Sequence, residues 1–339
     1  MKVHTQIPLR NYTTMKIGGP ARFMTNVHTK EELVEAINNA QSQNIPFHIL
    51  GSGSNTIVHD EGYDGLIIRN CIEGSTVLSD SASSTTLEIN AGENWDSVVK
   101  RTVEMNLRGI EALSAIPGTA GAAPVQNIGA YGQEIADTLV SLTAYDSLDK
   151  KWVTLENADC EFSYRSSIFR EGEAGRYAIN SITLELYKSR PEPPFYAAVQ
   201  EYFDTNHITQ VSVADIRTAV MAIRADKLPN PAEKPNSGSF FKNAIVEEWH
   251  FNDLIRDYPS MPHYDMGNKT YKIPTGWLIE QCGLKGSLIS GMRVHDKNAL
   301  VLINESANGY GDLALAREEI KGAVRDTFRI QIEQEPLEI

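Results

Sequence analysis

Residues 45–55 read IPFHILGSGSN, an apolar run that passes directly into a series of small residues. Ile45 to Leu50 is typical of a buried β-strand, so Gly51 to Asn55 would form a loop at its C-terminal end. Successive small residues let backbone N–H groups converge on one point, and glycine permits the positive φ angles that such a concave site needs. The segment predicts a loop that binds a phosphate or pyrophosphate, although a plain surface turn fits the same residues.

This loop does not match the two commonest nucleotide-binding motifs. It lacks the third glycine of the Rossmann fingerprint, and Thr56 to His59 reads as extended chain where a Rossmann domain has a helix. No lysine follows the glycines, as a P-loop requires. An anion-binding loop at this position therefore belongs to a different fold.

The residues around the loop alternate between strand and helix patterns. Ala21–Val27 and Leu66–Ile68 are predicted strands, and Thr29 with Glu32 has the pattern of a capping box that starts a helix. The apolar face of that helix consists of Leu33, Ala36, Ile37 and Ala40. Together these elements predict a βαβ-like unit that carries the small-residue loop.

A second, longer run of small residues, IPGTAGAAPVQNIGAYG, occupies positions 116–132. It separates a predicted amphipathic helix, Asp96–Met105, from a predicted strand, Leu139–Tyr145. So long a Gly/Ala/Pro loop is uncommon in a compact domain unless it is functional. Two such loops suit a long, charged cofactor that the backbone approaches closely from two sides, as FAD requires. A tightly packed domain interface is the alternative interpretation.

The rest of the chain mixes strands and helices. The Pro-rich segment 189–194 is a natural boundary. Ser212 resembles a helix cap, and the helix after it must stop before Pro229. Further strands are predicted at Leu87–Asn90, Ile179–Leu186, Ala299–Ile303 and Phe328–Ile332, and further helices at Val246–Tyr258, Pro274–Cys282 and Asp312–Thr327.

Composition excludes several classes of protein. A net charge of −13 argues against non-specific nucleic-acid binding, which needs a basic surface. No apolar run approaches the ~20 residues that span a bilayer, and the N-terminus has no apolar core of a signal peptide. Three widely spaced cysteines, Cys71, Cys160 and Cys282, fit a reducing, cytoplasmic compartment. The histidines form no metal-binding motif, so no metal is expected.

Ser239, in the segment GSFFKN (238–243), is a candidate proton donor. A serine hydroxyl is a poor acid unless nearby cations stabilise its alkoxide and it is held against the carbon that receives the proton. Arg224 and Lys227 precede it in the chain. Most Gly-Ser loops are only turns, however, and Ser237 fits the pattern nearly as well.

Taken together, these segments resemble the UDP-N-acetylenolpyruvoylglucosamine reductase family. The matching pieces follow the family's order along essentially the whole chain and are specific as a set. They are LGSGSN (50–55), AGENW (91–95), IPGTAGAAPVQNIGAYG (116–132), YRSSIF (164–169), GSFFKN (238–243), GWLIEQCGLKG (276–286) and ALVLIN (299–304).

The resemblance implies an α+β fold with a non-Rossmann FAD-binding domain and a C-terminal α+β substrate-binding domain. The FAD-binding domain would comprise two α+β lobes, residues 1–70 and 71–205. Residues 206–327 would bind substrate, and residues 328–339 would form a C-terminal strand that returns to the active site. FAD would be bound non-covalently, and the protein would be a monomer.

The same resemblance implies a two-stage reaction in peptidoglycan precursor synthesis. NADPH would give hydride to FAD and leave, and UDP-N-acetylglucosamine enolpyruvate would then be reduced to UDP-N-acetylmuramate. Ser239 matches the family's proton donor and Arg165 its catalytic arginine, whose guanidinium suits the substrate carboxylate. A surface salt bridge is the alternative for Arg165. Glu335 matches the catalytic glutamate, with Glu333, on the same side of a predicted strand, in reserve.

Binding residues are implied by position in the matching segments. Ala122 and Ala123 replace serines of the family, and glutamine is commoner than asparagine at Asn298. Tyr196 would lie in a loop that closes over substrate. For FAD the positions are Gly51, Ser52, Gly53, Ser54, Asn55, Pro117, Gly118, Ala122, Ala123, Ile128, Gly129, Ala130 and Arg224. For substrate they are Tyr164, Tyr196, Lys227, Asn243, Tyr264, Lys272, Lys285 and Asn298.

Two other functions fit parts of the sequence. A flavin oxidase with the same FAD fold would act on another small substrate and would not need Ser239. A UDP-sugar-binding or regulatory protein that had lost its chemistry would purify colourless. The presence of Arg165, Ser239 and Glu335 together argues against the second of these, because a protein that had lost its chemistry would be free to lose them.

Overall fold

The computed structural model describes all residues, 1–339, and its contacts divide the chain into two compact units. Unit 1 comprises Met1–Ile7, Ala21–Ser52 and Asp64–Ala225, and unit 2 comprises Pro8–Pro20, Gly53–Tyr63 and Asp226–Ile339. These limits differ from the predicted boundaries at residues 70, 205 and 327. Two short N-terminal segments, Pro8–Pro20 and Gly53–Tyr63, belong to the same unit as the C-terminal part of the chain. No local pattern in the sequence predicts this.

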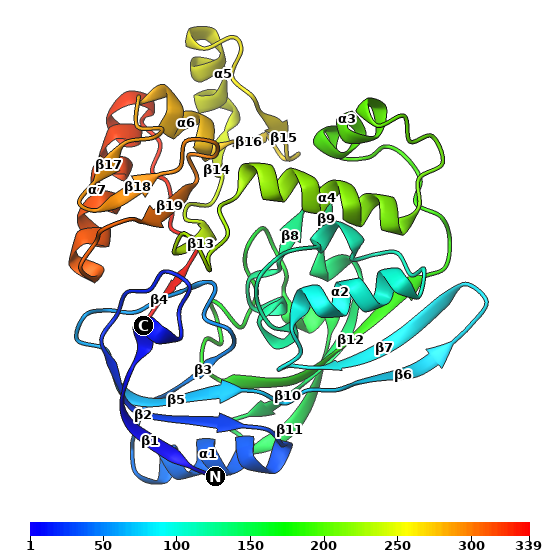
Figure 1. Ribbon diagram of the computed structural model, residues 1–339, viewed down its shortest axis with the longest axis vertical. Helices are drawn as coiled ribbons and strands as arrows, with labels where there is room; N and C mark the ends of the chain where they lie inside the picture. Colours follow the sequence, from blue (N-terminus) through cyan, green and yellow to red (C-terminus); the bar gives the residue numbers. More distant parts are fainter. The chain divides into compact units, whose positions relative to one another are not determined.

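The first sheet of unit 1 carries the first glycine loop. Its strands are β1 (Val3–Pro8), β2 (Pro20–Val27), β3 (Phe47–Leu50) and β5 (Tyr63–Asn70), in the order β1-β2-β5-β3. Helix α1 (Lys30–Ser42) lies along this sheet (Figure 1). The Thr29 side chain accepts a hydrogen bond from Glu32 N, and the predicted apolar face of α1 is buried against the sheet. The predicted helix start and core face are therefore confirmed.

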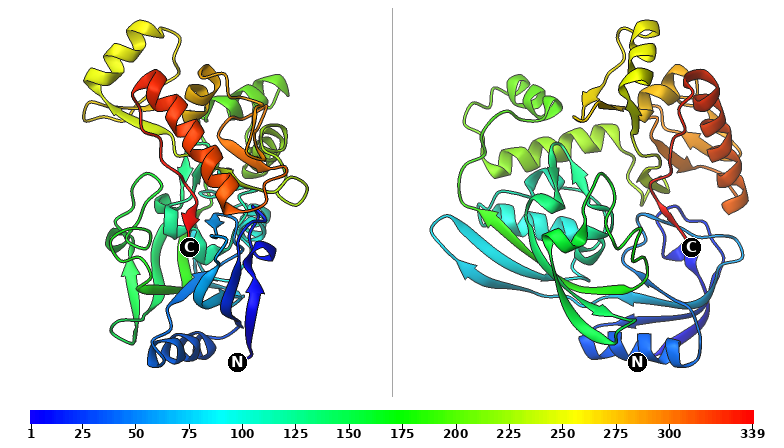
Figure 2. Two further views of the ribbon diagram at one scale, coloured as in Figure 1. Left: turned by 90° about the vertical axis from the view of Figure 1, so that its left-hand side faces the viewer. Right: turned by 180° about the vertical axis from the view of Figure 1, so that it is seen from behind.

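The second sheet of unit 1 is antiparallel and has the order β11-β10-β12-β7-β6. Helix α2 (Trp95–Glu104) packs on it through Trp95 and Val99, which are almost wholly buried (Figures 1 and 2). The predicted strands were correct in position but too short. The observed bounds are β6 (Ser75–Asp80), β7 (Ser84–Asn90), β10 (Leu139–Asp146), β11 (Lys151–Glu156) and β12 (Tyr177–Tyr187).

Unit 1 ends with two packed helices, α3 (Ala197–Thr205) and α4 (Val213–Lys227). They share a small apolar core that includes Phe203 and Val220. Ser212 caps α4, because its hydroxyl accepts a hydrogen bond from Asp215 N at 3.2 Å while its own backbone N–H donates to the Asp215 carboxylate. The predicted stop before Pro229 is confirmed.

Unit 2 packs its helices and two small sheets around one apolar core that contains Phe240, Phe241, Leu302 and Phe328. The sheets have the orders β13-β19-β18-β17 and β14-β16-β15. The strands are β13 (Asn236–Ser239), β14 (Ala244–Glu247), β15 (Tyr264–Asp265), β16 (Thr270–Ile273), β17 (Leu288–Ile289), β18 (Met292–Val294) and β19 (Val301–Asn304). The helices are α5 (Glu248–Asp257), α6 (Thr275–Gln281) and α7 (Tyr310–Phe328).

Two predicted elements of unit 2 differ in the structure. The helix predicted from Val246 begins at Glu248, because residues 244–247 pair with β16. The strand predicted at Phe328–Ile332 was wrong, since α7 runs to Phe328 and ends at Arg329, which has φ of 57°. After α7 the chain forms a single antiparallel bridge, between Gln334 and Phe241, and then β20 (Leu337–Glu338) lies parallel to β4 (Thr56–Ile57) (Figure 1).

The mixture of separate antiparallel sheets and helices agrees with the predicted α+β class. None of the helices combines the length and the apolar character needed to cross a membrane.

Candidate active site

The first glycine loop, residues 51–55, follows β3 as predicted and has a conformation that only glycine accommodates at its centre. Gly53 has φ of +68°, and a Cβ atom there would lie 1.9 Å from the Tyr12 carbonyl oxygen. Thr14 braces the loop, donating from its backbone N–H to Gly53 O at 3.1 Å and from its hydroxyl to Ser54 O at 3.4 Å. The chain then enters β4, an extended segment, as the sequence predicted.

The two glycine loops meet inside unit 1. A Cβ atom on Gly51 would lie 2.6 Å from Thr119 Oγ1 and 3.6 Å from Ala122 Cβ, both in the second loop. The predicted pair of loops is therefore brought together at Gly51. The absence of a side chain on Gly51 lets the two loops approach each other closely at Thr119, a residue that the sequence pattern did not single out.

The second glycine loop, residues 116–132, is held by the segment AGENW. Trp95 N donates to Gly118 O, and Gly121 N donates to Ala91 O. Short 3-10 turns at Ala120–Ala122 and Pro124–Gln126 and the strand pair β8 (Gly129–Ala130) and β9 (Gln133–Glu134) give the loop its shape. Of the two alanines that replace family serines, Ala122 is exposed and Ala123 is buried in the core.

Arg165 lies against the second glycine loop. Its guanidinium donates hydrogen bonds to the carbonyl oxygens of Asn127 and Gly129, and it stacks over the Tyr164 ring at 5.4 Å. A Cβ atom on Gly129 would lie 2.8 Å from Arg165 Nη1, so glycine is needed for this approach. Arg165 is half-buried and donates to backbone carbonyl oxygens of the second glycine loop, so its side chain is not freely solvated.

Arg224 carries a buried, unsatisfied donor. Its Nε atom has no hydrogen-bond partner, although the side chain also bonds Tyr131 of the second glycine loop. Burial lowers the pKa of Arg224, and the neighbouring Tyr131 and Asp96 oppose that shift. An orphaned guanidinium N–H beside a glycine-rich loop is what an anionic cofactor such as FAD would satisfy.

Tyr196 packs on the same loop. It immediately precedes α3, is 41% exposed, and its ring lies edge-on to Tyr131 with centroids 5.5 Å apart. In this conformation the predicted tyrosine loop is folded against the second glycine loop within unit 1. Tyr131 itself was missed by sequence reasoning, because its role depends on contacts with distant residues.

Ser239 is the last residue of β13 and pairs with Val301 of β19. It is half-buried. Asn236, at the start of β13, donates its backbone N–H to Thr14 O at 3.1 Å, so Thr14 links the Ser239 strand to the first glycine loop. The competing serine, Ser237, is buried, and its hydroxyl has no hydrogen-bond partner.

The C-terminal segment brings Glu335 next to the Ser239 strand. Glu335 N donates to Phe240 O at 2.9 Å, and Lys242 N donates to Glu333 O at 2.9 Å. The two candidate glutamates have different surroundings. The Glu333 side chain is 73% exposed and pairs with Lys242 at 3.3 Å, whereas Glu335 is half-buried. The geometry favours Glu335.

The residues predicted to bind substrate are distributed over several elements. In unit 2, Lys272 lies over the Tyr264 ring at 5.2 Å, from opposite positions on β16 and β15. Asn243 Oδ1 accepts from Thr275 N, and Lys285 pairs with Glu280 at 3.0 Å. Asn298 Oδ1 accepts from Leu300 N, and Lys227 ends α4. Tyr164 and Tyr196 belong to unit 1.

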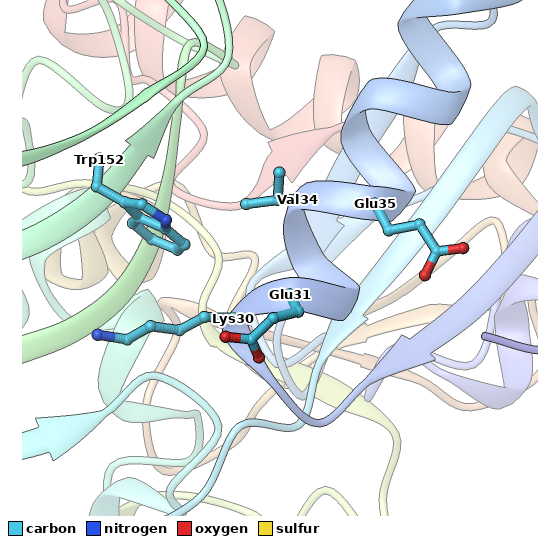
Figure 3. A pocket seen from close by; sticks show the side chains of 5 residues that line it. All are labelled: Lys30, Glu31, Val34, Glu35 and Trp152. Atoms are coloured by element: carbon cyan, nitrogen blue, oxygen red, sulfur yellow. The ribbon is translucent and has the colours of Figure 1, made fainter.

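Two cavities involve none of the predicted site residues. In unit 1, a cavity of about 380 Å³ is lined by α1 and Trp152, with Lys30 over the tryptophan ring at 5.6 Å (Figure 3). In unit 2, a cavity of about 600 Å³ includes Lys234, Arg293 and His295. No group of three or more His, Cys, Asp and Glu side chains has an arrangement that could hold a metal ion.

Comparisons with known proteins identify two domains, one that binds FAD and one typical of a reductase. Residues 21–155 match the model of an FAD binding domain, and residues 230–339 match the UDP-N-acetylenolpyruvoylglucosamine reductase C-terminal domain. The UDP-N-acetylenolpyruvoylglucosamine reductase of Ralstonia nicotianae is 39% identical over 335 residues, covering 98% of each chain. That of Dechloromonas aromatica is 37% identical over 342 residues, covering 99% of each. The chain belongs to the UDP-N-acetylenolpyruvoylglucosamine reductase family.

A solved structure agrees on the fold. The reductase of this name from Thermus caldophilus is 23% identical and superimposes with a TM-score of 0.70 over 100% of this chain and 99% of the other. The predicted family, the α+β FAD-binding fold and the FAD cofactor are therefore confirmed.

Proposed function

We propose that this chain reduces the enolpyruvyl double bond of UDP-N-acetylglucosamine enolpyruvate to give UDP-N-acetylmuramate, with NADPH as the electron source. FAD, when bound, supplies the two-electron carrier between NADPH and the alkene. The observation that carries the proposal is the meeting of the two glycine loops at Gly51 and Thr119. This meeting brings two small-residue loops together, and the orphaned Nε of Arg224 adds an unsatisfied cationic donor. Both features suit an anionic cofactor.

The residues that would hold FAD are those of the two loops. Gly53 keeps the first loop in its positive-φ conformation, and Gly129 leaves room for Arg165 beside the second. Backbone contacts at these glycines do not depend on the hydroxyl groups lost at Ala122 and Ala123. Arg224 adds a buried guanidinium to the second loop through Tyr131.

Three side chains would act on the substrate. Ser239 gives a proton to the alkene carbon that bears the ether oxygen, while the terminal carbon receives hydride. Arg165 pairs with the substrate carboxylate, which becomes more electron-rich as the bond is reduced. Glu335 acts with the serine in this proton transfer. It is half-buried, and its backbone N–H bonds the carbonyl oxygen of Phe240, the residue after Ser239.

The UDP group would be bound by Lys227, Lys272 and Lys285, with Tyr196, Tyr264, Asn243 and Asn298. Lysines can gather around a diphosphate even in a protein with a net charge of −13, because binding depends on the local field. The chain would act as a cytoplasmic monomer in peptidoglycan precursor synthesis.

The visible spectrum of the purified protein tests this function. Flavin absorption bands should bleach when NADPH is added without oxygen and recover when UDP-N-acetylglucosamine enolpyruvate follows. An oxidase of the same fold would instead recover on admission of air and ignore the UDP sugar. A colourless protein that does not turn over NADPH would contradict the proposal. The full-length matches to reductases support the reductase over the oxidase.

A further inference from the structure

The C-terminal segment of unit 2 is hydrogen-bonded on both sides of Glu335. Before Pro336, where the chain bends, Glu335 N donates to Phe240 O at 2.9 Å. After it, Leu337 N donates to Asn55 O and Ile339 N donates to Ile57 O, which places the end of the segment along β4. Glu335 therefore lies between a contact with the Ser239 strand and a contact with the first glycine loop.

One arginine of α7 holds the side chains on both sides of Glu335. Arg317 donates from Nη1 to Gln334 Oε1 at 2.9 Å and forms an ion pair with Glu338. Its side chain is only 17% exposed. Gln334 in turn donates to Pro336 O at 2.9 Å. The Arg317 guanidinium thus joins Gln334, before Glu335, to Glu338, after it. These side-chain contacts are additional to the backbone hydrogen bonds of the segment.

Arg317 is itself part of a fixed frame. Tyr310, about two turns before Arg317 on α7, donates its hydroxyl to the Glu338 carboxylate at 3.0 Å. The start of α7 is tied to the residues after β4, because Asp60 accepts from Tyr310 N at 2.8 Å and His59 stacks on the Tyr310 ring with centroids 3.9 Å apart. The helix, β4 and the C-terminal segment therefore brace one another.

The charges in this frame are complementary. Burial alone would raise the pKa of the Glu338 carboxyl, but the Arg317 charge and the Tyr310 hydroxyl together lower it. The pKa of Arg317 is raised although burial opposes this, because Tyr310 and Glu338 stabilise the cation. The pair is ionised at neutral pH, so the contact has the strength of a charge-assisted hydrogen bond.

We propose that Arg317 is a positioning residue for Glu335, acting through Gln334 and Glu338. The inference rests on the proposed role of Glu335. A catalytic group must be held within ~0.5 Å of its productive position by residues that are themselves fixed. The hydrogen bond from Glu335 N to Phe240 O and the following proline restrain the Glu335 backbone. The Arg317 contacts add to this restraint, because they hold the side chains of Gln334 and Glu338 on either side of Glu335.

Arg317→Ala tests the inference, with Arg317→Lys and Arg325→Ala beside it. Misplacement of a reacting group by 1 Å costs about 10²-fold in rate. Arg317→Ala should therefore slow reduction of the enolpyruvyl substrate by about 10- to 100-fold, while flavin reduction by NADPH and the KM for the UDP sugar stay within about twofold. Arg317→Lys keeps the ion pair with Glu338 and should recover part of the rate.

Arg325→Ala is the matched control. Arg325 lies on the same helix but pairs with Asp326 on the exposed surface, so both half-reactions should remain unchanged. Hydrogen exchange gives a readout independent of activity. The amides of Glu335, Leu337 and Ile339 should exchange faster in Arg317→Ala than in the wild type or Arg325→Ala, with the core of α7 unaffected.

A double mutant separates this inference from the proposed function. In a Glu335→Gln background, Arg317→Ala should slow substrate reduction no further, because both changes remove the same effect. If Glu335→Gln leaves the rate unchanged, the proposed role of Glu335 fails. Suppose instead that Glu335→Gln slows substrate reduction. The positioning role then fails if Arg317→Ala has the wild-type rate, and it also fails if Arg317→Ala slows both half-reactions equally. Glu338→Gln, which preserves shape, gives the same test should Arg317→Ala unfold.

Discussion

The backbone N–H of Glu335 donates a 2.9 Å hydrogen bond to the carbonyl oxygen of Phe240, the residue that follows Ser239. Residues 95 positions apart in the chain are thus neighbours in unit 2. The bond places a glutamate of the C-terminal segment beside β13, the strand that ends at Ser239, as the proposed proton-transfer site requires.

Replacing Ser239 by alanine should separate the two half-reactions. Reduction of the enolpyruvyl substrate should slow by at least ~10²-fold, the low end for general acid catalysis. Flavin reduction by NADPH needs no proton from this serine and should continue at the wild-type rate. Stopped-flow absorbance of the flavin measures both. Ser237→Ala, two residues away, is the control and should leave both rates unchanged. Equal slowing of both halves by Ser239→Ala would refute the assignment.

The two candidate glutamates can be distinguished by isosteric replacement. Glu335→Gln should slow substrate reduction by about 10²-fold or more, because it removes a half-buried carboxylate beside the Ser239 strand. Glu333→Gln removes only an exposed pair with Lys242 and should change the rate little, as surface ion pairs contribute at most about 1 kcal/mol. Single-turnover rates give the comparison. The opposite order of effects would transfer the role to Glu333.

Gly53→Ala should weaken FAD binding and reduce stability. The positive φ alone costs about 1–2 kcal/mol for a residue with a side chain, and the new Cβ would also collide with Tyr12 O. Gly175→Ala is a matched control, since Gly175 also has a positive φ but nothing within 4 Å of its Cβ position. The ratio of FAD to protein after gel filtration and the urea midpoint report the two effects. Equal behaviour of both variants would show that the close approach at Gly53 is unimportant.

The Asp146–Arg176 pair should make stability depend on pH in the acid range. Hydrogen bonds from Arg176 hold the pKa of the almost fully buried Asp146 carboxyl at about 2, below its ordinary value. The unfolded chain binds a proton near pH 4 and the folded chain only near pH 2. The stabilisation from this pair is therefore complete above about pH 5, and it declines as the pH falls from about 4 to about 2.

Asp146→Asn measures this contribution. It should lower the free energy of unfolding by about 2 kcal/mol at pH 7, because hydrogen bonds to a charged group are lost. The difference from wild type should shrink as pH approaches 3.5. Urea unfolding at several pH values, followed by tryptophan fluorescence, provides the measurement. A difference that stays constant down to pH 3.5 would mean that the pair does not set the acid sensitivity.

Several elements of unit 1 were predicted from the sequence because their signals are local. The capping pattern at Thr29 and the apolar spacing of Leu33 and Ile37 each depend on residues within one or two helical turns. The prediction at Phe328–Ile332 failed in an instructive way. Ile330 and Ile332 are buried and their neighbours exposed, as alternation suggested, but packing of Phe328 in the core extends α7 to that residue.

From the sequence alone, the α+β class, the two glycine loops, the family and the candidate residues Arg165, Ser239 and Glu335 followed, because motifs keep their order and spacing along the chain. Only the tertiary structure revealed which distant segments lie together. Tyr12 and Thr14 shape the first glycine loop, and Arg317 holds both sides of Glu335. Such contacts join residues far apart in the chain, and their free energy comes from packing and hydrogen bonding that no local pattern records.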